Sequence, residues 1–260
     1  MTHSLSGLPG IVLLFAISLA ATAHQCAAAV NGGVSVIAGA SGEDVDDAGS
    51  MLIATADFNR DGVADVAEIV RPAGDRGGPI RLQLLFGRRD GGFTPGPDPM
   101  TLAGDPRAIA SGDFNGDGNP DLLIGDGNGA VTELLGDGKG NLKFAGEIAH
   151  VGSAVSIAVG DFNRDGIPDV AVSDYRANAV TILLGSANGS FQVGWSFALP
   201  RRGTRYYLAA ADFNGDGVSD LAISSEEEGT FVVMLGNGNG TFTYAPALSN
   251  LRDPNSYCPT

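Results

Sequence analysis

A ten-residue acidic phrase occurs four times in the chain and constrains its fold more than any other feature. The copies read DFNRDGVADV at 57–66, DFNGDGNPDL at 113–122, DFNRDGIPDV at 161–170 and DFNGDGVSDL at 212–221. Successive copies start about 50 residues apart. Self-similarity at such a period is typical of repeat proteins, in which each copy marks one structural unit.

The second unit shows most clearly which elements such a unit contains. We expect its strands at 106–114, 120–126, 130–138 and 141–150, with the acidic phrase between the first two. A segment rich in Gly, Asn and Asp precedes the fourth strand of each unit, and these residues supply the positive φ angles of tight hairpins. Four strands joined in sequence form an antiparallel meander. The repeated meander predicts an all-β protein, a β-propeller of about four four-stranded blades, as a closed small ring or an open arc.

The spacing of the phrases predicts where each unit begins and ends. We expect units at 51–105, 106–153, 154–203 and 204–250, followed by a tail at 251–260. The first unit is the longest because residues 70–80 are inserted between its second and third strands. The segment 30–50 precedes the units and contains the apolar stretch VSVIAG at 34–39. We expect this stretch to form a spare strand that pairs with the last blade and closes the ring.

Phenylalanine recurs at two places in the units. One set lies in the acidic phrase and the other follows the Gly-rich segment; together they are Phe58, Phe114, Phe162, Phe213, Phe93, Phe144, Phe191 and Phe242. We expect these rings to pack between adjacent blades.

The N-terminal segment has the character of an export signal. The first 30 residues contain no Lys, Arg, Asp or Glu and include the apolar run IVLLFAISLAATA at 11–23. This run is shorter than the ~20 apolar residues that span a membrane. We expect a signal peptide at 1–29, cleaved after residue 23 or 29, and no membrane span after cleavage. The mature protein is then secreted, periplasmic or at the cell surface; a retained N-terminal anchor is the alternative.

Cys26 and Cys258 are the only cysteines. Cleavage after Ala23 leaves both, and an exported protein could join them as a disulfide between the two ends of the mature chain. Cleavage after Ala29 leaves Cys258 alone.

The acidic phrase has the donor pattern of a calcium loop. Oxygen-bearing side chains occupy its positions 1, 3, 5 and 9, glycine at position 6 permits a sharp bend, and the backbone carbonyl of position 7 turns toward the same point. The absence of His and Cys argues against zinc or copper. The predicted ligands are Asp57, Asn59, Asp61, Val63 and Asp65; Asp113, Asn115, Asp117, Asn119 and Asp121; Asp161, Asn163, Asp165, Ile167 and Asp169; and Asp212, Asn214, Asp216, Val218 and Asp220. We expect up to four Ca²⁺ ions; Asx-rich turns without metal are the alternative.

The four phrases resemble the calcium loops of FG-GAP repeats, as in integrin α-chain propellers, and of the related VCBS-type repeats of secreted proteins. The resemblance extends over about residues 51–250. The literal Phe-Gly pair stands at Phe86–Gly87, with Leu-Gly in the other copies. Family propellers usually have seven blades, whereas this chain has four units. The resemblance implies extracellular binding or adhesion by a calcium-rigidified scaffold.

Charge and motif content exclude several classes of function. A net charge of −15 argues against nucleic acid as a partner. His150 is the only histidine beyond the signal segment, and H-E-x-x-H and G-x-S-x-G motifs are absent, so we expect no enzyme activity. We expect a binding or adhesion module for extracellular carbohydrate or protein. The alternatives are a structural propeller piece that completes its ring by self-association, or an accessory protein of a hydrolase.

Consecutive turns of a meander alternate between its two ends. The acidic phrases and Gly-rich hairpins therefore share one face, and the more variable connections share the other, where binding specificity is expected. Candidate ligand-binding residues on that second face are Tyr175, Arg176, Arg201, Arg202, Arg205 and Tyr206. The alternative is a solvated loop whose arginines balance nearby acidic residues.

Overall fold

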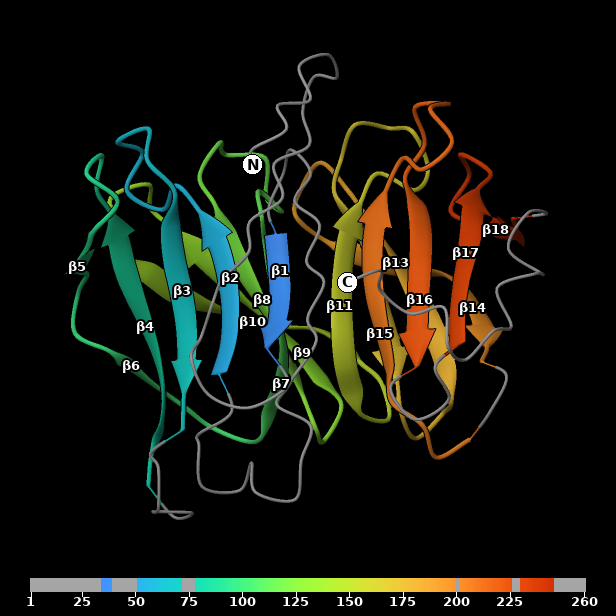
Figure 1. The fold of residues 1–260 in the computed structure, drawn as a ribbon, viewed down its shortest axis with the longest axis horizontal. Coiled ribbons are helices and arrows are strands. Elements are labelled where there is room, and N and C mark those ends of the chain that lie inside the picture. Colours follow the sequence, from blue (N-terminus) through green and yellow to red (C-terminus); the bar gives the residue numbers. More distant parts are fainter. Residues whose placement is uncertain (1–33, 39–50, 72–77, 200–201, 226–229, 246–260) are drawn as a thin grey trace, which may run out of the picture.

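The computed structural model describes residues 34–38, 51–71, 78–199, 202–225 and 230–245, and every regular element within them is a β-strand (Figure 1). The predicted all-β class is therefore confirmed. The predicted signal peptide (1–29), the C-terminal tail (251–260) and both cysteines lie outside the described residues.

The strands form four antiparallel sheets, which we call blades 1 to 4 in chain order. Blade 1 contains β1 (Val34–Ala38), β2 (Met51–Ala56), β3 (Asp65–Val70), β4 (Ile80–Gly87), β5 (Phe93–Pro95) and β6 (Met100–Leu102). Blade 2 contains β7 (Pro106–Gly112), β8 (Asp121–Asp126), β9 (Ala130–Gly136) and β10 (Leu142–His150). Blade 3 contains β11 (Ala154–Gly160), β12 (Asp169–Asp174), β13 (Ala179–Gly185) and β14 (Phe191–Ala198). Blade 4 contains β15 (Tyr206–Ala211), β16 (Asp220–Ser225), β17 (Thr230–Gly236) and β18 (Phe242–Tyr244).

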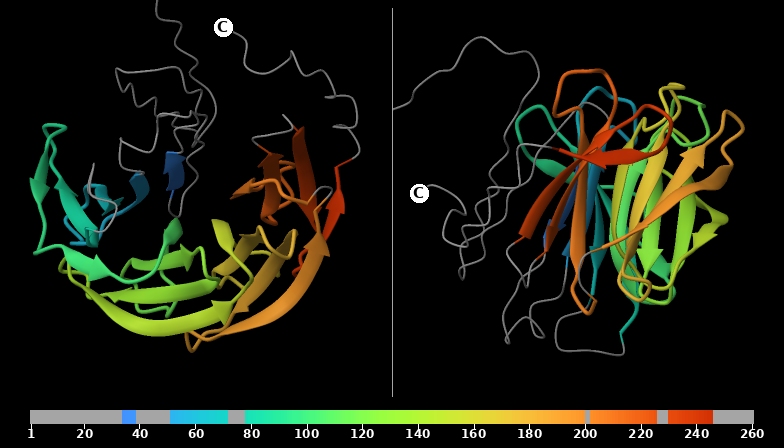
Figure 2. Two further views of the ribbon diagram at one scale, coloured as in Figure 1. Left: turned by 90° about the horizontal axis from the view of Figure 1, so that it is seen from below. Right: turned by 90° about the vertical axis from the view of Figure 1, so that its right-hand side faces the viewer.

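The blades stand side by side as an open crescent, with blades 1 and 4 at its ends (Figure 2). The first meander strands of successive blades, β2, β7, β11 and β15, contact one another along the inside of the crescent. Three apolar clusters fill the spaces between successive blades. Of the two predicted outcomes, a closed small ring and an open arc, the structure therefore shows the open arc.

The burial of the middle strands follows from their place in the crescent. In β8 and β12 nearly every residue is buried, because apolar side chains on both faces meet a neighbouring blade. In β3 of blade 1, buried and half-buried residues alternate strictly. Only one face of that strand is covered, by blade 2.

The predicted ring-closing strand pairs elsewhere than expected. β1 lies antiparallel to β2 of blade 1, with Val34 opposite Thr55 and Ala38 opposite Met51. The prediction that it joins the last blade is wrong, because blade 4 lies at the far end of the crescent (Figure 2).

The fourth strand of blade 1 is broken into two pieces. β5 pairs with the end of β4, and β6 pairs with its beginning. Pro95, Pro97 and Pro99 fall in or between the two pieces. Proline has no N–H to donate, so a continuous ladder cannot form there.

The phenylalanine prediction is correct in the interior of the crescent. Phe58, Phe114 and Phe162 are 2%, 2% and 0% exposed. Phe114 packs edge-on against Phe191, and Phe162 packs edge-on against Phe242. The prediction is wrong for Phe93 and Phe213, which are 52% and 48% exposed in the end blades of the crescent, and for Phe144, which is 62% exposed. Leu142 takes its place, because Leu142 is the residue opposite Gly136, as Phe191 is opposite Gly185.

Candidate functional site

The four acidic phrases form the connections between the first and second meander strands, and we call residues 57–65, 113–121, 161–169 and 212–220 acidic loops 1 to 4. They share one face with the Gly-rich hairpins: the hairpin residue Gly140 donates its N–H to the carbonyl of Phe58 in acidic loop 1 (2.9 Å). Other connections meet on the opposite face, where the Tyr175 N–H binds the Ser153 carbonyl (3.0 Å). The predicted division of the turns between two faces matches these contacts.

Each acidic loop is folded by side-chain oxygens that accept backbone N–H groups. In acidic loop 3, Asp161 accepts from Gly166 (2.9 Å) and Asn163 accepts from Asp165 (2.9 Å). Asp165 in turn accepts from Ile167 (2.8 Å). Gly166 has a φ of 79°, a conformation that glycine adopts without strain. The corresponding bonds recur in the other three loops.

The last aspartate of each loop has a second, structural role that the sequence did not reveal. Asp65, Asp121, Asp169 and Asp220 are all 0% exposed. One carboxylate oxygen of each accepts the N–H of the loop phenylalanine. The other accepts the N–H of the glycine that ends the third meander strand. The carboxylate thus joins its loop to that strand. In the sequence, the only signal of this contact is that the last aspartate of the loop and the Leu-Gly or Phe-Gly pair at the end of the third strand recur together in every unit.

Burial makes the carboxyl groups of Asp65, Asp121 and Asp169 hard to ionise. It raises the pKa of Asp169 to about 6, although the Gly185 and Phe162 N–H groups favour the ionised form and oppose the shift. Negative charge on Asp165 and Asp161 raises this pKa further. The pKa values of Asp65 and Asp121 are raised for the same main reason, desolvation by burial.

The donor set fits a hard divalent cation in chemistry and order. All donors are oxygens, and a carboxylate or amide oxygen that accepts one hydrogen bond retains a lone pair for a metal. A cation would also offset the charge of neighbouring aspartates that, after burial, contributes to the raised pKa values of Asp65, Asp121 and Asp169. Among the described residues, no group of three or more His, Cys, Asp or Glu side chains already converges as a metal site. Binding therefore requires the side chains at positions 1, 3 and 5 to turn toward a common point.

Arginine links the loops in pairs. Arg60, at position 4 of acidic loop 1, donates to the side-chain oxygen of Asn119 in acidic loop 2 (3.1 Å). Arg164, at position 4 of acidic loop 3, donates to the Asp216 carbonyl in acidic loop 4 and lies 3.7 Å from its carboxylate. Glycine occupies position 4 of acidic loops 2 and 4.

The structure separates the predicted ligand-binding residues. Tyr175 is 41% exposed, and Arg176, Arg202 and Arg205 are exposed on the opposite face. Tyr206 is only 4% exposed and belongs to the core between blades 3 and 4. Its expected surface position is therefore wrong, because its side chain faces blade 3 in the alternation of β15. Arg201 lies outside the described residues.

An ion-pair cluster on the opposite face was not anticipated. Asp105 contacts Arg71 and Arg107, each at 2.6 Å. Burial alone would raise the pKa of Asp105, but hydrogen bonds and charge from Arg107 and Arg71 outweigh it and lower the pKa below its usual value. The cluster joins the residue after β3 of blade 1 to the start of blade 2.

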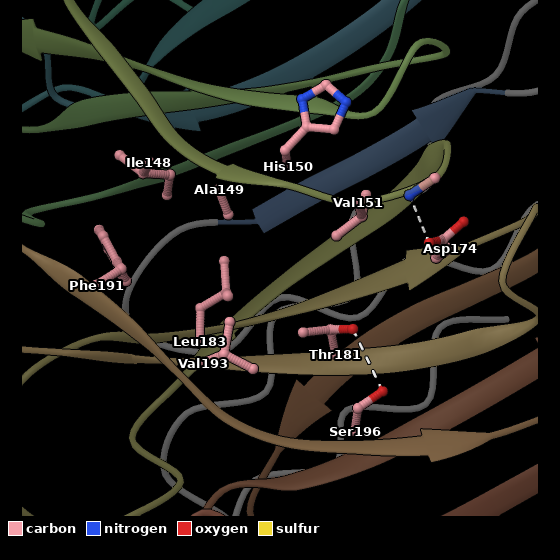
Figure 3. A pocket seen from close by; sticks show the side chains of 11 residues that line it. Ile148, Ala149, His150, Val151, Asp174, Thr181, Leu183, Phe191, Val193 and Ser196 are labelled. Atoms are coloured by element: carbon pink, nitrogen blue, oxygen red, sulfur yellow. Dashed lines mark hydrogen bonds between the residues drawn. The ribbon is translucent and has the colours of Figure 1, made fainter.

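A pocket of about 430 Å³ lies between blades 2 and 3, lined by residues of β10, β13 and β14 (Figure 3). Apolar side chains such as Leu183 and Val193 form part of its wall, and the hydroxyls of Thr181 and Ser196 lie 3.4 Å apart beside them (Figure 3). His150, at its rim, lies 2.8 Å from Glu147. None of the predicted ligand-binding residues lines this pocket. In the described part of the chain, no helix has the length and apolarity of a membrane span.

Repeated meanders around one axis, with an acidic loop at the same corner of each, define a protein of the β-propeller repeat class. The sequence model of the FG-GAP-like repeat matches residues 70–124, 113–172 and 161–223, and that of the FG-GAP repeat matches residues 207–244. The chain belongs to the FG-GAP-like repeat family.

Two further comparisons add little to this assignment. A chain of the crystal structure of BBS1N in complex with ARL6DN, soaked with lead, is similar at 12% identity and a TM-score of 0.36; the match covers 75% of this chain and 82% of that chain. A comparison with curated proteins gave no match.

Proposed function

We propose that the protein is an extracellular, non-catalytic binding module whose blades are stabilised by calcium. FG-GAP-like repeats in a blade arrangement indicate a propeller-type binding module. Export rests on the apolar N-terminal segment of the sequence.

The observation that carries the calcium proposal is the fourfold recurrence of one folded oxygen-donor loop. Each loop places three aspartates and at least one asparagine within nine residues, and its last aspartate is buried with no exposed surface. The ion would be held by the side chains at positions 1, 3, 5 and 9 and by the carbonyl of position 7. When bound, it supplies positive charge that neutralises the loop and fixes the corner of the blade.

Calorimetric titration and thermal unfolding test this proposal. We expect calcium to bind with a dissociation constant on the order of 10⁻⁴ to 10⁻³ M, typical of extracellular sites, and to raise the melting temperature. Replacing Asp61, Asp117, Asp165 and Asp216 with Asn should weaken binding while retaining the backbone hydrogen bonds of the loops. A melting temperature that is the same in calcium and in EDTA would contradict the proposal.

The ligand site is proposed on the opposite face, away from the acidic loops. Tyr175, Arg176, Arg202 and Arg205 are exposed there on connections that differ from blade to blade. Arginine and tyrosine bind hydroxyl-rich and acidic surfaces, which fits a carbohydrate or a protein partner.

A glycan-array screen in calcium-containing buffer, followed by capture assays with the best ligand, tests this site. The triple variant Arg201→Ala, Arg202→Ala, Arg205→Ala should lose binding. The matched control is Arg88→Ala, which removes an exposed arginine of the blade 1 hairpin and should bind normally. If the triple variant binds as well as the unmodified protein, the ligand site lies elsewhere.

A further inference from the structure

Within the part of the chain that the structure describes, the two ends of the crescent carry blade faces with no neighbouring blade. On blade 4 the uncovered face includes Phe213 and Phe231, which are 48% and 38% exposed. On blade 1 the uncovered face includes the half-buried side chains of Ile53, Val66 and Leu85, together with Phe93, which is 52% exposed.

These faces repeat the surfaces that already pack together inside the chain. Ile53, Val66 and Leu85 occupy the repeat positions that Ile157, Val170 and Leu183 occupy in blade 3. Those three residues of blade 3 are at most 1% exposed and pack against blade 2. Blade 1 therefore presents to solvent the same apolar surface that blade 3 buries.

One aromatic contact is left incomplete at both ends. The loop phenylalanine of blade 2 packs against Phe191 of blade 3 with ring centroids 6.0 Å apart, and that of blade 3 packs against Phe242 of blade 4 at 5.3 Å. At the junction of blades 1 and 2 Leu142 fills the corresponding place in the cluster that holds Phe58, so by the same rule Phe213 of blade 4 requires a large apolar side chain from the next blade. Phe93 of blade 1 is the ring at the corresponding hairpin position, opposite Gly87.

At two of the three junctions the side chain at position 4 of the loop also complements the next hairpin; the junction of blades 2 and 3 has Gly116 and Ala187 at these positions. At the junction of blades 1 and 2, Arg60 lies over Gly138 of the next hairpin; a side-chain carbon on Gly138 would come within 2.8 Å of Arg60 Cδ. Arg164 lies over Gly238 in the same way at the junction of blades 3 and 4. At the free ends the pattern is reversed: Gly215 stands at position 4 of blade 4, and Arg89 stands at the hairpin position of blade 1.

Because Gly215 has no side chain, blade 4 leaves room for the side chain of Arg89, and the acidic residues beside Gly215 can pair with its charge. The Arg89 side chain would enter the space above Gly215, beside the acidic loop that carries Asp212 and Asp216. The Glu68 and Gln83 side chains on the same face of blade 1 bind each other at 2.9 Å, so this polar pair enters the contact with a hydrogen bond already made.

We propose that the two end faces bind each other between two copies of the chain. Blade 4 of each copy packs on blade 1 of the other, with Phe213 against Phe93 and Arg89 above Gly215. Two junctions related by a twofold axis then close a ring of two sets of four blades, at the upper end of the range of about four to eight blades found in propellers. The inference does not depend on calcium or on the proposed ligand.

Light scattering on the size-exclusion peak of the full chain, with calcium present, measures the oligomeric state. We expect the mass of two chains. Phe213→Asp and Phe93→Asp should each raise the dissociation constant of the dimer by roughly thirtyfold or more, as expected for a buried aromatic anchor. Phe144→Asp is the matched control, because Phe144 is exposed away from both end faces and its replacement should leave the dimer intact.

A swap of residues tests the geometry of the junction. Gly215→Arg places two arginines in a space that holds one, so it should favour the monomer; the fold tolerates it because Arg60 and Arg164 adopt the same left-handed φ at that position. Adding Arg89→Gly recreates the arrangement of Arg60 over Gly138 and should restore the dimer. Failure of the double variant to recover the dimer would contradict the proposed register.

Cross-linking gives a readout that does not depend on the strength of association. In a background with Cys26 and Cys258 replaced by Ser, Phe93→Cys and Phe213→Cys proteins are treated with a short bismaleimide, alone and mixed. We expect covalent dimers only in the mixture, because the contact joins unlike faces. A monomeric mass for the unmodified chain, dimers that cross-link like with like, or assemblies that grow with concentration would each overturn the closed two-copy ring.

Discussion

Asp169 accepts a hydrogen bond from the backbone N–H of Gly185 at 2.8 Å, although the two residues lie at the ends of different strands of blade 3. Its other carboxylate oxygen accepts the N–H of Phe162, also at 2.8 Å. One buried side chain thus connects the acidic loop, the second strand and the third strand. Because the same pair of bonds occurs in all four blades, this aspartate supports the blade as well as the proposed metal site.

Because Asp169 supports both the blade and the proposed metal site, the substitution Asp169→Ala should destabilise the protein even without calcium. The substitution leaves two buried N–H groups without acceptors, so we expect the free energy of unfolding to fall by about 2–5 kcal/mol. Urea unfolding should show this loss in EDTA as well as in calcium. Asp165→Asn is the control, because Asp165 lies at an exposed position of the same loop and Asn keeps its bond to Ile167. A loss confined to calcium-containing buffer would show that Asp169 acts only through the metal.

The raised pKa of Asp169 predicts a pH dependence whose sign changes with calcium. In the folded, metal-free protein this pKa is about 6, against 3.8 for an ordinary aspartate. The folded state then binds more protons than the unfolded state between these values, so stability increases as pH falls from about 7 to about 4. Asp65 and Asp121, whose pKa values are also raised, act in the same direction.

Calcium should reverse this trend, because the ion binds the ionised carboxylates and protons compete with it. We therefore expect the melting temperature to rise on acidification in EDTA and to fall on acidification in excess calcium. Scanning calorimetry at several pH values measures both curves. A melting temperature that falls with pH in EDTA over the same window would contradict the assignment of the raised pKa values.

The architecture was predictable because one repeated phrase encodes it. The phrase fixed the number of blades, the four strands of blade 2 and the division of turns between two faces. The pairing of β1 was not predictable, because an isolated apolar strand can add to any free sheet edge and the choice depends on the shape of the whole crescent. The break between β5 and β6 follows from Pro95, Pro97 and Pro99, which interrupt the fourth strand of blade 1.

The site was predictable in its donors and not in its side-chain surroundings. The acidic phrase identifies the oxygen donors that lie close together, because all donors of one loop fall within nine consecutive residues. That Asp169 also accepts the Gly185 N–H depends on packing between strands, and so does the burial of Tyr206 in the core. Both features depend on which residues of neighbouring strands and blades face each other. The sequence of one repeat unit does not contain this information.

Arg164 should weaken the proposed calcium site of the neighbouring loop. Its guanidinium lies 3.7 Å from the Asp216 carboxylate, and both side chains are about half exposed. We expect Arg164→Gly to raise the calcium affinity of acidic loop 4 by about two- to fivefold at low ionic strength, as for an exposed ion pair, and less at high salt. Calorimetric titration at two salt concentrations measures the change. Arg88→Gly removes an arginine paired with Asp90 outside the acidic loops and should leave the affinity unchanged.

Glu133 is the acidic residue that the fold accommodates least well. It is 7% exposed in the middle of β9, its Oε1 has no hydrogen-bond partner, and burial followed by the charge of Asp121 raises its pKa. Blades 1, 3 and 4 have Leu84, Ile182 and Val233 at this position, counted from the glycine that ends each third strand.

We therefore expect Glu133→Leu to stabilise the protein by about 1–3 kcal/mol, because it removes a buried group that lacks a partner. The gain should be larger at pH 7 than at pH 5, since the ionised form that burial penalises becomes more populated as pH rises through the raised pKa. Urea unfolding at the two pH values measures both effects. Glu147→Leu, on the exposed strand β10, serves as the control and should change stability little. Destabilisation by Glu133→Leu would show that this carboxylate has a partner in solution, and would make it a candidate ligand for a cation beside Asp121.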